Sequence, residues 1–159
     1  KAKILKKGED ITLVSSSYMI IECLRCAEIL KNYSINIEVV DIQSLRPLDI
    51  KTIVKSIKKT KKAVIVDNGG LTYGVSSEII ARVYENLKLN EKNEITLKRI
   101  GLLDNPIPSS KNLAKYCYPT FKDIIEQIKM MLNKKIDINY NKFDNVPNDQ
   151  PNKNFMGPF

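Results

Sequence analysis

Histidine is absent from this chain of 159 residues, and its absence removes several classes of active site. A Ser-His-Asp triad uses an imidazole as its general base, and many cysteine nucleophiles depend on one as well. Histidine is also a common ligand of zinc. The sequence therefore excludes a Ser-His-Asp triad, a Cys-His pair and a His-containing zinc site formed by this chain.

Cysteine is scarce, and three cysteines cannot form a disulfide framework, so we expect a reducing compartment. Cys23 and Cys26 form a C-L-R-C motif that resembles half of a redox or metal site. The motif lies inside the apolar-periodic stretch 20–30, whereas a reactive pair needs a helix N-terminus to stabilise its thiolate. We therefore predict that Cys23 and Cys26 pack in the core, and that Cys117 does the same.

Long apolar runs are lacking too, and none approaches the ~20 residues that a membrane span needs. The first ten residues, KAKILKKGED, contain neither the apolar core nor the cleavage site of a secretory signal. The chain does not begin with methionine, which suggests a trimmed chain or a fragment. Its length suffices for one domain with its own core.

Positive charge is abundant, since the formal net charge is +8. Lysine greatly exceeds arginine, which favours a solvated lysine-rich surface. The alternative is a basic nucleic-acid-binding module centred on residues 58–62, KKTKK. That segment lies where a predicted helix ends, and cations there also offset the negative end of the helix dipole.

Short apolar runs alternate with helical periodicity, which predicts an α/β fold. The predicted strands are residues 11–14, 37–42, 63–66 and 95–100, and residues 3–6 add an edge strand. Continuous apolar strands favour a parallel sheet covered on both faces, a three-layer α/β/α domain with five strands. The short link through Gly8 predicts that the edge strand runs antiparallel to residues 11–14. We predict a domain over residues 1–135, and an extended or disordered polar tail over residues 136–159.

Residues 68–74, NGGLTYG, are the best ligand candidate because they follow a strand and open a helix. The segment fits neither the dinucleotide fingerprint nor the P-loop, because Leu71 and Val75 occupy positions that need glycine and lysine. Its glycines are also explained by a tight turn and close packing. An independent flavodoxin-like domain that binds a nucleotide or flavin here stays an alternative.

Four segments together resemble the C-terminal domain of the β subunit of the decarboxylating component of pyruvate dehydrogenase, in the transketolase C-terminal group. They follow the family's order from residue 1 to about residue 134: GEDITLVSSSYMIIECLRCAEIL, VVDIQSLRPLDIKTIVKSIKKT, AVIVDNGGLTYGVSSEIIARV and DNPIPSSKNLAKYCYPTFKDIIEQI. The second and fourth segments favour pyruvate over branched-chain 2-oxo acids and acetoin. Ser76 and Ser77 depart from the family's usual Gly-Ala pair.

The resemblance implies a non-catalytic part of a larger enzyme. In that family, thiamine diphosphate and Mg²⁺ lie between the α subunit and the N-terminal domain of the β subunit. The family's Gly-Asp-Gly…Asn motif is missing here, so we expect no catalytic, cofactor-binding or metal-binding residue and no cofactor bound to this chain alone. The implied partners are the α subunit, a second β subunit and the subunit-binding domain of dihydrolipoyl acetyltransferase, with no membrane. The implied compartment is the matrix or stroma of a mitochondrion or plastid in a eukaryote, and otherwise the cytoplasm.

The resemblance also suggests interface residues. Glu94 matches an acidic residue that pairs with a basic residue of the subunit-binding domain, although it could equally be a solvated loop carboxylate. Arg46 is left free to pair across an interface. The other suggested contacts lie in the glycine-rich turn and the Asp-Asn-Pro loop, and they are Asp67, Gly69, Gly70, Gly74 and Asp104.

Overall fold

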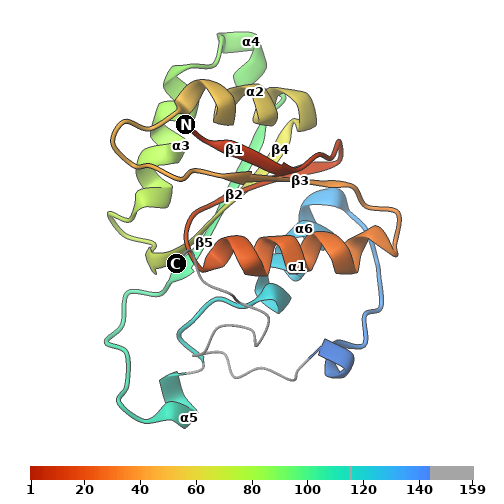
Figure 1. Cartoon of the computed structure of the whole chain (residues 1–159), viewed down its shortest axis with the longest axis vertical. Helices are drawn as coiled ribbons and strands as arrows, with labels where there is room; N and C mark the ends of the chain where they lie inside the picture. Colours follow the sequence, from red (N-terminus) through yellow and green to blue (C-terminus); the bar gives the residue numbers. More distant parts are fainter. Residues whose placement is uncertain (115, 144–159) are drawn as a thin grey trace.

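The computed structural model describes residues 1–114 and 116–143, which form a five-stranded sheet between two layers of helices (Figure 1). The strands lie in the order β1-β3-β2-β4-β5. Strand β1 runs antiparallel to β3, and every other pair is parallel. The strands are β1 (Lys3–Lys6), β2 (Ile11–Ser15), β3 (Ile37–Asp41), β4 (Lys62–Gly70) and β5 (Thr96–Leu102). The predicted three-layer α/β/α fold is therefore confirmed.

Helices cover both faces of this sheet. Helices α2 and α3 lie on one face, and α1 and α6 lie on the other (Figure 1). The helices are α1 (Met19–Lys31), α2 (Ile50–Thr60), α3 (Val75–Glu85), α4 (Leu89–Lys92), α5 (Lys111–Ala114), α6 (Phe121–Leu132) and the 3-10 helix η1 (Tyr140–Phe143). None of these helices has the length and apolarity that crossing a lipid bilayer requires, among the residues that the structure describes.

Two apolar cores result from the alternation of side chains along the strands. Leu13 enters the core under α1 and α6, while its neighbour Val14 enters the core under α2 and α3. Both cysteines of the C-L-R-C motif are completely buried in the first core and are free thiols. Burial raises the pKa of Cys23 and of Cys26, so both stay protonated and their predicted packing role is confirmed. Cys117 is only half-buried, so the prediction that it packs in the core is wrong.

The edge strand is antiparallel as predicted, but its predicted partner is wrong. Strand β1 pairs with β3 rather than with β2, because β2 already lies between β3 and β4. The link between β1 and β2 crosses the amino end of β3, where Glu9 and Asp10 donate their N–H groups to the Asn36 carbonyl, each at 3.0 Å. Gly8 is needed at this crossing, because a Cβ atom there would overlap the backbone of Ile37.

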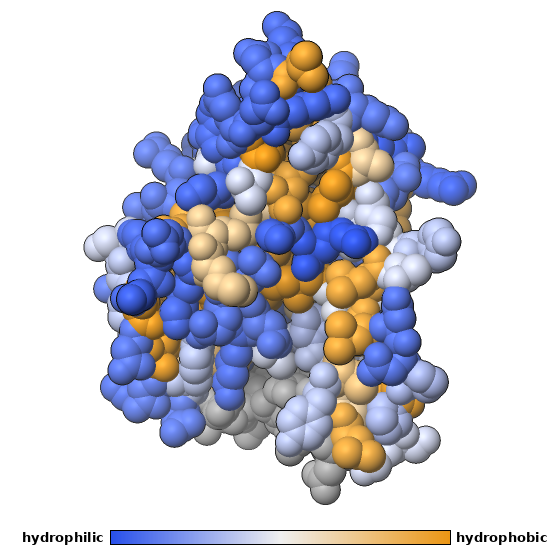
Figure 2. Space-filling model, turned by 180° about the vertical axis from the view of Figure 1, so that it is seen from behind, coloured by the Kyte–Doolittle hydropathy of each residue, from blue (hydrophilic) through white to orange (hydrophobic). Residues whose placement is uncertain are grey.

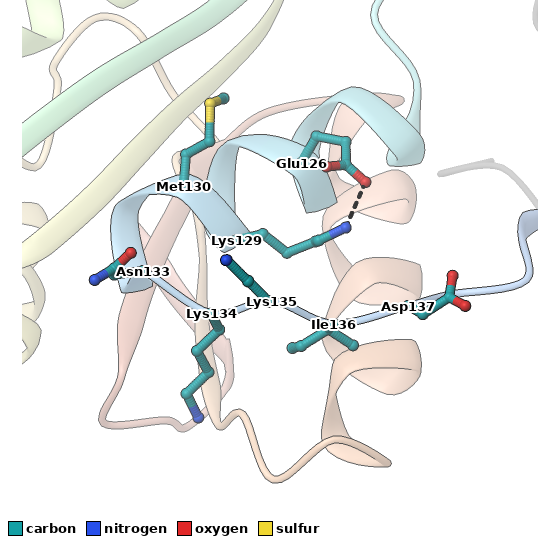
Figure 3. Close-up of a pocket in the computed structure, with 8 residues that line it drawn as sticks. All are labelled: Glu126, Lys129, Met130, Asn133, Lys134, Lys135, Ile136 and Asp137. Atoms are coloured by element: carbon teal, nitrogen blue, oxygen red, sulfur yellow. Dashed lines mark hydrogen bonds and ion pairs between the residues drawn. The ribbon is translucent and has the colours of Figure 1, made fainter.

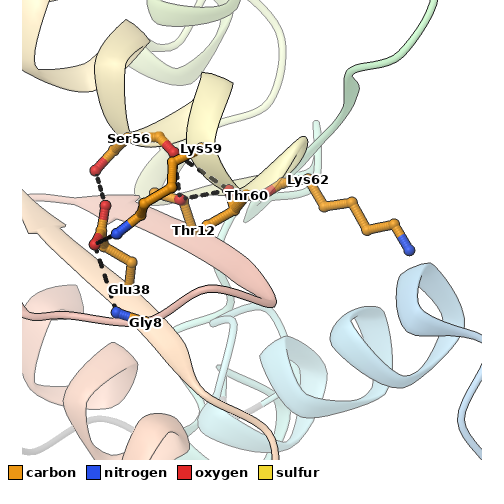
Figure 4. Close-up of polar contacts among 7 residues, drawn as sticks. All are labelled: Gly8, Thr12, Glu38, Ser56, Lys59, Thr60 and Lys62. Carbon is orange, nitrogen blue, oxygen red and sulfur yellow. Dashed lines mark hydrogen bonds and ion pairs between the residues drawn. The ribbon is translucent and has the colours of Figure 1, made fainter.

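A buried carboxylate joins the crossing to α2 (Figure 4). Glu38 is 1% exposed, and it accepts hydrogen bonds from the hydroxyl of Ser56, the ammonium of Lys59 and the N–H of Gly8. Beside it, the hydroxyls of Thr12 and Thr60 lie 2.8 Å apart. A buried charge needs such partners, so the cluster fixes how the end of α2 sits on the sheet.

Residues 136–143, the beginning of the predicted tail, lie against α1 and α6. Ile138 is 6% exposed and belongs to the first core. Phe143 accepts a hydrogen bond from Arg25 through its carbonyl, and Tyr140 donates to the Glu126 carboxylate at 2.5 Å. The division of the chain at residue 135 stays a prediction, and residues 144–159 lie outside the described residues.

Candidate assembly and docking surfaces

The glycine-rich segment lies at the carboxyl edge of the sheet, and part of it belongs to β4. The sequence predicted that the strand ends at Val66, but β4 continues to Gly70. The reason is pairing with β5: after an irregularity in register, Gly70 lies opposite Leu102, and the Leu71 N–H donates to the Leu102 carbonyl at 2.9 Å. The turn itself is therefore only residues 71–73.

Close packing explains two of the glycines around this turn. A Cβ atom on Gly74 would overlap the carbonyl oxygen of Gly70, and one on Gly101 would lie 2.8 Å from the carbonyl oxygen of Gly69. A Cβ atom on Gly70 would make only ordinary contact, 3.5 Å from the Thr72 carbonyl oxygen. These contacts favour the interpretation of the segment as a tight, closely packed turn rather than as a nucleotide-binding loop.

Asp67 faces the interior of the turn. One carboxylate oxygen accepts from the Gly69 N–H at 3.1 Å, and the other is buried without a hydrogen-bond partner. That second oxygen lies 3.4 Å and 3.6 Å from where side chains on Gly69 and Gly74 would begin. The hydroxyl of Ser76, in the first turn of α3, is also buried without a partner. The carboxylate of Asp67 thus packs inside the turn, and the interface role suggested for it stays a prediction.

Hydrogen bonds that the sequence did not predict hold this turn in place. Arg99 donates to the Leu71 carbonyl at 2.6 Å and also to the hydroxyl of Ser77. The hydroxyl of Thr72 donates to the carboxylate of Asp104, so the structure brings the turn and the Asp-Asn-Pro loop together. The contact of Arg99 depends on the pairing of β5 with β4, which the order of residues along the chain does not reveal.

The turn presents one large side chain to solvent. Tyr73 is 100% exposed, with a backbone φ of 57°. Apolar side chains after β5 are exposed as well, namely Leu103, Ile107 and Leu113. Figure 2 shows hydrophobic side chains forming a broken column on the side where the chain descends from β5 toward α5. Exposed apolar side chains gathered in this way are typical of a contact surface.

Arg46 lies in the loop after β3 and is exposed. A bridge between Leu45 and Leu48 closes this loop, and the Arg46–Pro47 peptide bond is cis. Asp49 caps α2 as predicted, because its carboxylate accepts from the Thr52 N–H at 3.2 Å. Hydrogen bonds from the Thr52 hydroxyl and N–H hold the pKa of Asp49 below its usual range. The loop is thus a well-formed scaffold, and it leaves the Arg46 guanidinium on the surface.

Glu94 lies at the opposite, amino edge of the sheet, just before β5. It is exposed, and its carboxylate pairs with the ammonium of Lys61, which follows α2. Helix α4 adjoins it in the chain, at the top of the molecule in Figure 1. Leu89 at the start of α4 is 82% exposed. We call residues 88–94 together with Lys61 the α4 corner.

The lysine cluster 58–62 is largely engaged with carboxylates. Lys58 pairs with Glu91 at 2.9 Å, Lys59 with Glu38, and Lys61 with Glu94. With three of its four lysines beside carboxylates, this segment does not form the continuous positive patch that a nucleic-acid surface needs, so the geometry does not support the nucleic-acid alternative.

A shallow groove of about 550 Å³ lies where α6 ends and the chain turns back along α1 (Figure 3). In it, Lys129 donates to Glu126 at 2.9 Å, and Met130 is 67% exposed.

No group of three or more Cys, Asp or Glu side chains able to hold a metal ion occurs within residues 1–114 and 116–143.

The model of the family "Transketolase, C-terminal domain" matches residues 1–124. The β subunit of the pyruvate dehydrogenase E1 component from Pisum sativum mitochondria is 36% identical over 138 residues, which is 87% of this chain and 38% of that protein. The mitochondrial protein of Homo sapiens is 38% identical over 133 residues, covering 84% and 37%. That of Rickettsia bellii is 34% identical over 129 residues, covering 81% and 39%.

The chain thus spans about two fifths of the length of the curated relatives that it matches. A solved split-gene transketolase, an inactive beta4 tetramer, superposes with a TM-score of 0.72 at 24% identity, covering 86% of this chain and 43% of that one. At that identity the likeness concerns the fold alone.

Proposed function

Because the chain belongs to the transketolase C-terminal domain family, we propose that it is the C-terminal part of a pyruvate dehydrogenase E1 β subunit. The carrying observation is the 34–38% identity to such subunits from a plant, a mammal and a bacterium over more than four fifths of the chain. In this proposal the whole enzyme decarboxylates pyruvate and acylates lipoyl groups. It acts in an organelle matrix or stroma, or in the cytoplasm of a bacterium.

The part that we assign to this chain is assembly. The exposed Tyr73 and the apolar side chains after β5 supply a surface for a further subunit, either the α subunit or a second β subunit. Arg46 and Asp104 lie on loops at the same edge of the sheet, where they are available for polar contacts. Gly74 contributes by shaping the turn that carries Tyr73, because a side chain there would overlap the Gly70 carbonyl, and Gly69 and Gly70 end the strand that leads into this turn.

We assign the docking of the acyltransferase's subunit-binding domain to the α4 corner. Glu94 is the candidate contact because its carboxylate is exposed and follows α4, whose Leu89 is exposed as well. An ion pair between Glu94 and a basic group of the partner, desolvated in the interface, would contribute more to the binding free energy than a surface ion pair does.

Thiamine diphosphate and its divalent metal belong to other parts of the enzyme in this proposal. The described residues do not fit the group, because they include no acidic cluster for the metal and the only glycine-rich turn is filled by its own packing. No chemical step is therefore assigned to a residue of this chain.

Immunoprecipitation from the source organism tests the proposed function. An antibody against this chain should bring down an E1 α subunit and an activity that oxidises pyruvate, dependent on thiamine diphosphate, with ferricyanide as electron acceptor. An antibody against an unrelated protein of the same compartment is the control. Recovery of the chain without an α subunit and without that activity would refute the proposal.

A further inference from the structure

Three lysine–glutamate pairs surround the end of α2, and they differ in how accessible their carboxylates are. The side chain of Glu38 is 1% exposed in its pair with Lys59. That of Glu91 is 26% exposed, and its carboxylate also accepts from the Lys88 N–H at 2.8 Å, which fixes the start of α4.

The third pair is the most open one. In it the side chains of Lys61 and Glu94 are 51% and 57% exposed. Glu94 is therefore the carboxylate of the three that a partner can reach without dismantling local structure.

The backbone on both sides of this third pair is fixed. Lys61 is the C-cap residue of α2, with φ at 63°, and its N–H donates to the Ile57 carbonyl at 2.8 Å. The Lys61 carbonyl accepts from the Thr96 N–H at 2.9 Å, and the Glu94 N–H donates to the Glu91 carbonyl at 3.1 Å. The ammonium and the carboxylate are thus held within reach of each other, while about half of each side chain is exposed to solvent.

We propose that Lys61 is a built-in competitor for the cation that docks on Glu94; this rests on the docking role proposed above. In the free protein Lys61 neutralises the carboxylate, and a partner's arginine or lysine must displace it. Because the pair is exposed and screened, the displacement weakens docking only moderately, by up to about fivefold. Lys61 lowers the apparent affinity of every partner cation by the same factor, so it sets the strength of docking rather than the choice between arginine and lysine.

The experiment measures the affinity of the acyltransferase's subunit-binding domain for the assembled enzyme by calorimetry at fixed salt. The variants are Lys61→Gln, Glu94→Gln and the double variant. Lys58→Gln is the matched control, because it removes the same charge from the same end of α2 but frees Glu91 instead. We expect Lys61→Gln to tighten binding by about threefold to fivefold, while Lys58→Gln changes it by less than about twofold. In the Glu94→Gln background the Lys61 substitution should have no effect.

Each result has a distinct meaning. If Glu94→Gln weakens docking but Lys61→Gln behaves like Lys58→Gln, the competitor role is refuted and the docking role stands. If Lys61→Gln weakens binding, Lys61 contacts the partner directly and the inference is wrong. If the wild-type enzyme and every variant fail to bind, or if wild type and Glu94→Gln bind equally, the proposed docking role itself fails.

Discussion

A single methyl group at Gly74 has no room, because it would overlap the carbonyl oxygen of Gly70. We predict that Gly74→Ala lowers the free energy of unfolding by about 1–3 kcal/mol, since the turn must shift to accept it. Gly70→Ala is the control four residues away, where the added methyl group makes ordinary contact, and its effect should stay below about 1 kcal/mol. Urea denaturation measures both, and equal effects would contradict the packing of this turn.

Two glutamates should give the stability of the protein opposite responses to pH. Glu22 is 5% exposed, and burial raises its pKa above the ordinary 4.5, against a smaller lowering by Arg25. The folded state therefore holds this proton more tightly than the unfolded state, so stability falls as pH rises from about 4.5 through the raised pKa. Hydrogen bonds from Tyr140 and Lys129 lower the pKa of Glu126, so its stabilising contribution is present above 4.5 and is lost as pH falls through the lowered value.

Urea unfolding at several pH values between about 3 and 7 tests this difference. The stability of wild type relative to Glu22→Gln should decrease with pH, whereas that of wild type relative to Glu126→Gln should increase. The same slope for both variants would show that one of the two assignments is wrong.

At the residue scale, the sequence predicts contacts between neighbours in the chain better than contacts between elements. Asp49 and Thr52 are three residues apart, and the expected cap forms. Arg99 and Leu71 are 28 residues apart, and no local pattern predicts their hydrogen bond. The pairing of Glu94 with Lys61, 33 residues away, was not predicted for the same reason.

At the scale of elements, the same limit decides which strands pair. The apolar runs locate all five strands. The runs of β2, β3 and β4 reflect burial on both faces of the sheet, whereas no residue of the edge strands β1 and β5 is fully buried. The apolar runs do not reveal that β1 pairs with the outer edge of β3. This pairing depends on the crossing at Gly8 and on the fact that β2 already has two neighbours. The absence of periodicity after residue 135 likewise predicts a tail, although single side chains such as Ile138 pack there without any repeat.

The segment 136–143 should therefore contribute to folding stability. We predict that Ile138→Ala lowers the free energy of unfolding by about 2–4 kcal/mol, because it leaves a cavity in the core formed with α1 and α6. Ile107→Ala is the matched control, since its side chain is 44% exposed on a loop and should lose less than about 1 kcal/mol. A loss below about 0.5 kcal/mol for Ile138→Ala would mean that the segment does not pack on the domain in solution.

At the scale of the whole molecule, the two ends of the sheet differ in character. The carboxyl edge presents Tyr73 and the apolar side chains after β5, whereas the amino edge presents lysines paired with glutamates. An apolar edge favours a lasting subunit interface, and a charged corner favours a salt-dependent, exchangeable contact. This division of roles could not be derived from net charge, because a total of +8 does not reveal where the charges are paired.

We predict that the isolated chain self-associates through the apolar carboxyl edge. Sedimentation velocity should detect association that grows with protein concentration and persists at high salt, because burial of apolar surface is not screened by ions. Tyr73→Asn combined with Leu103→Ser should shift the chain to monomer, and asparagine tolerates the positive φ at residue 73. Leu89→Ser is the control, since it removes an apolar side chain that is more exposed than Leu103 from the other end of the molecule and should leave association unchanged. A wild-type chain that stays monomeric at high concentration, or a Leu89→Ser variant that dissociates as fully as the double variant, would show that the carboxyl edge is not the contact surface.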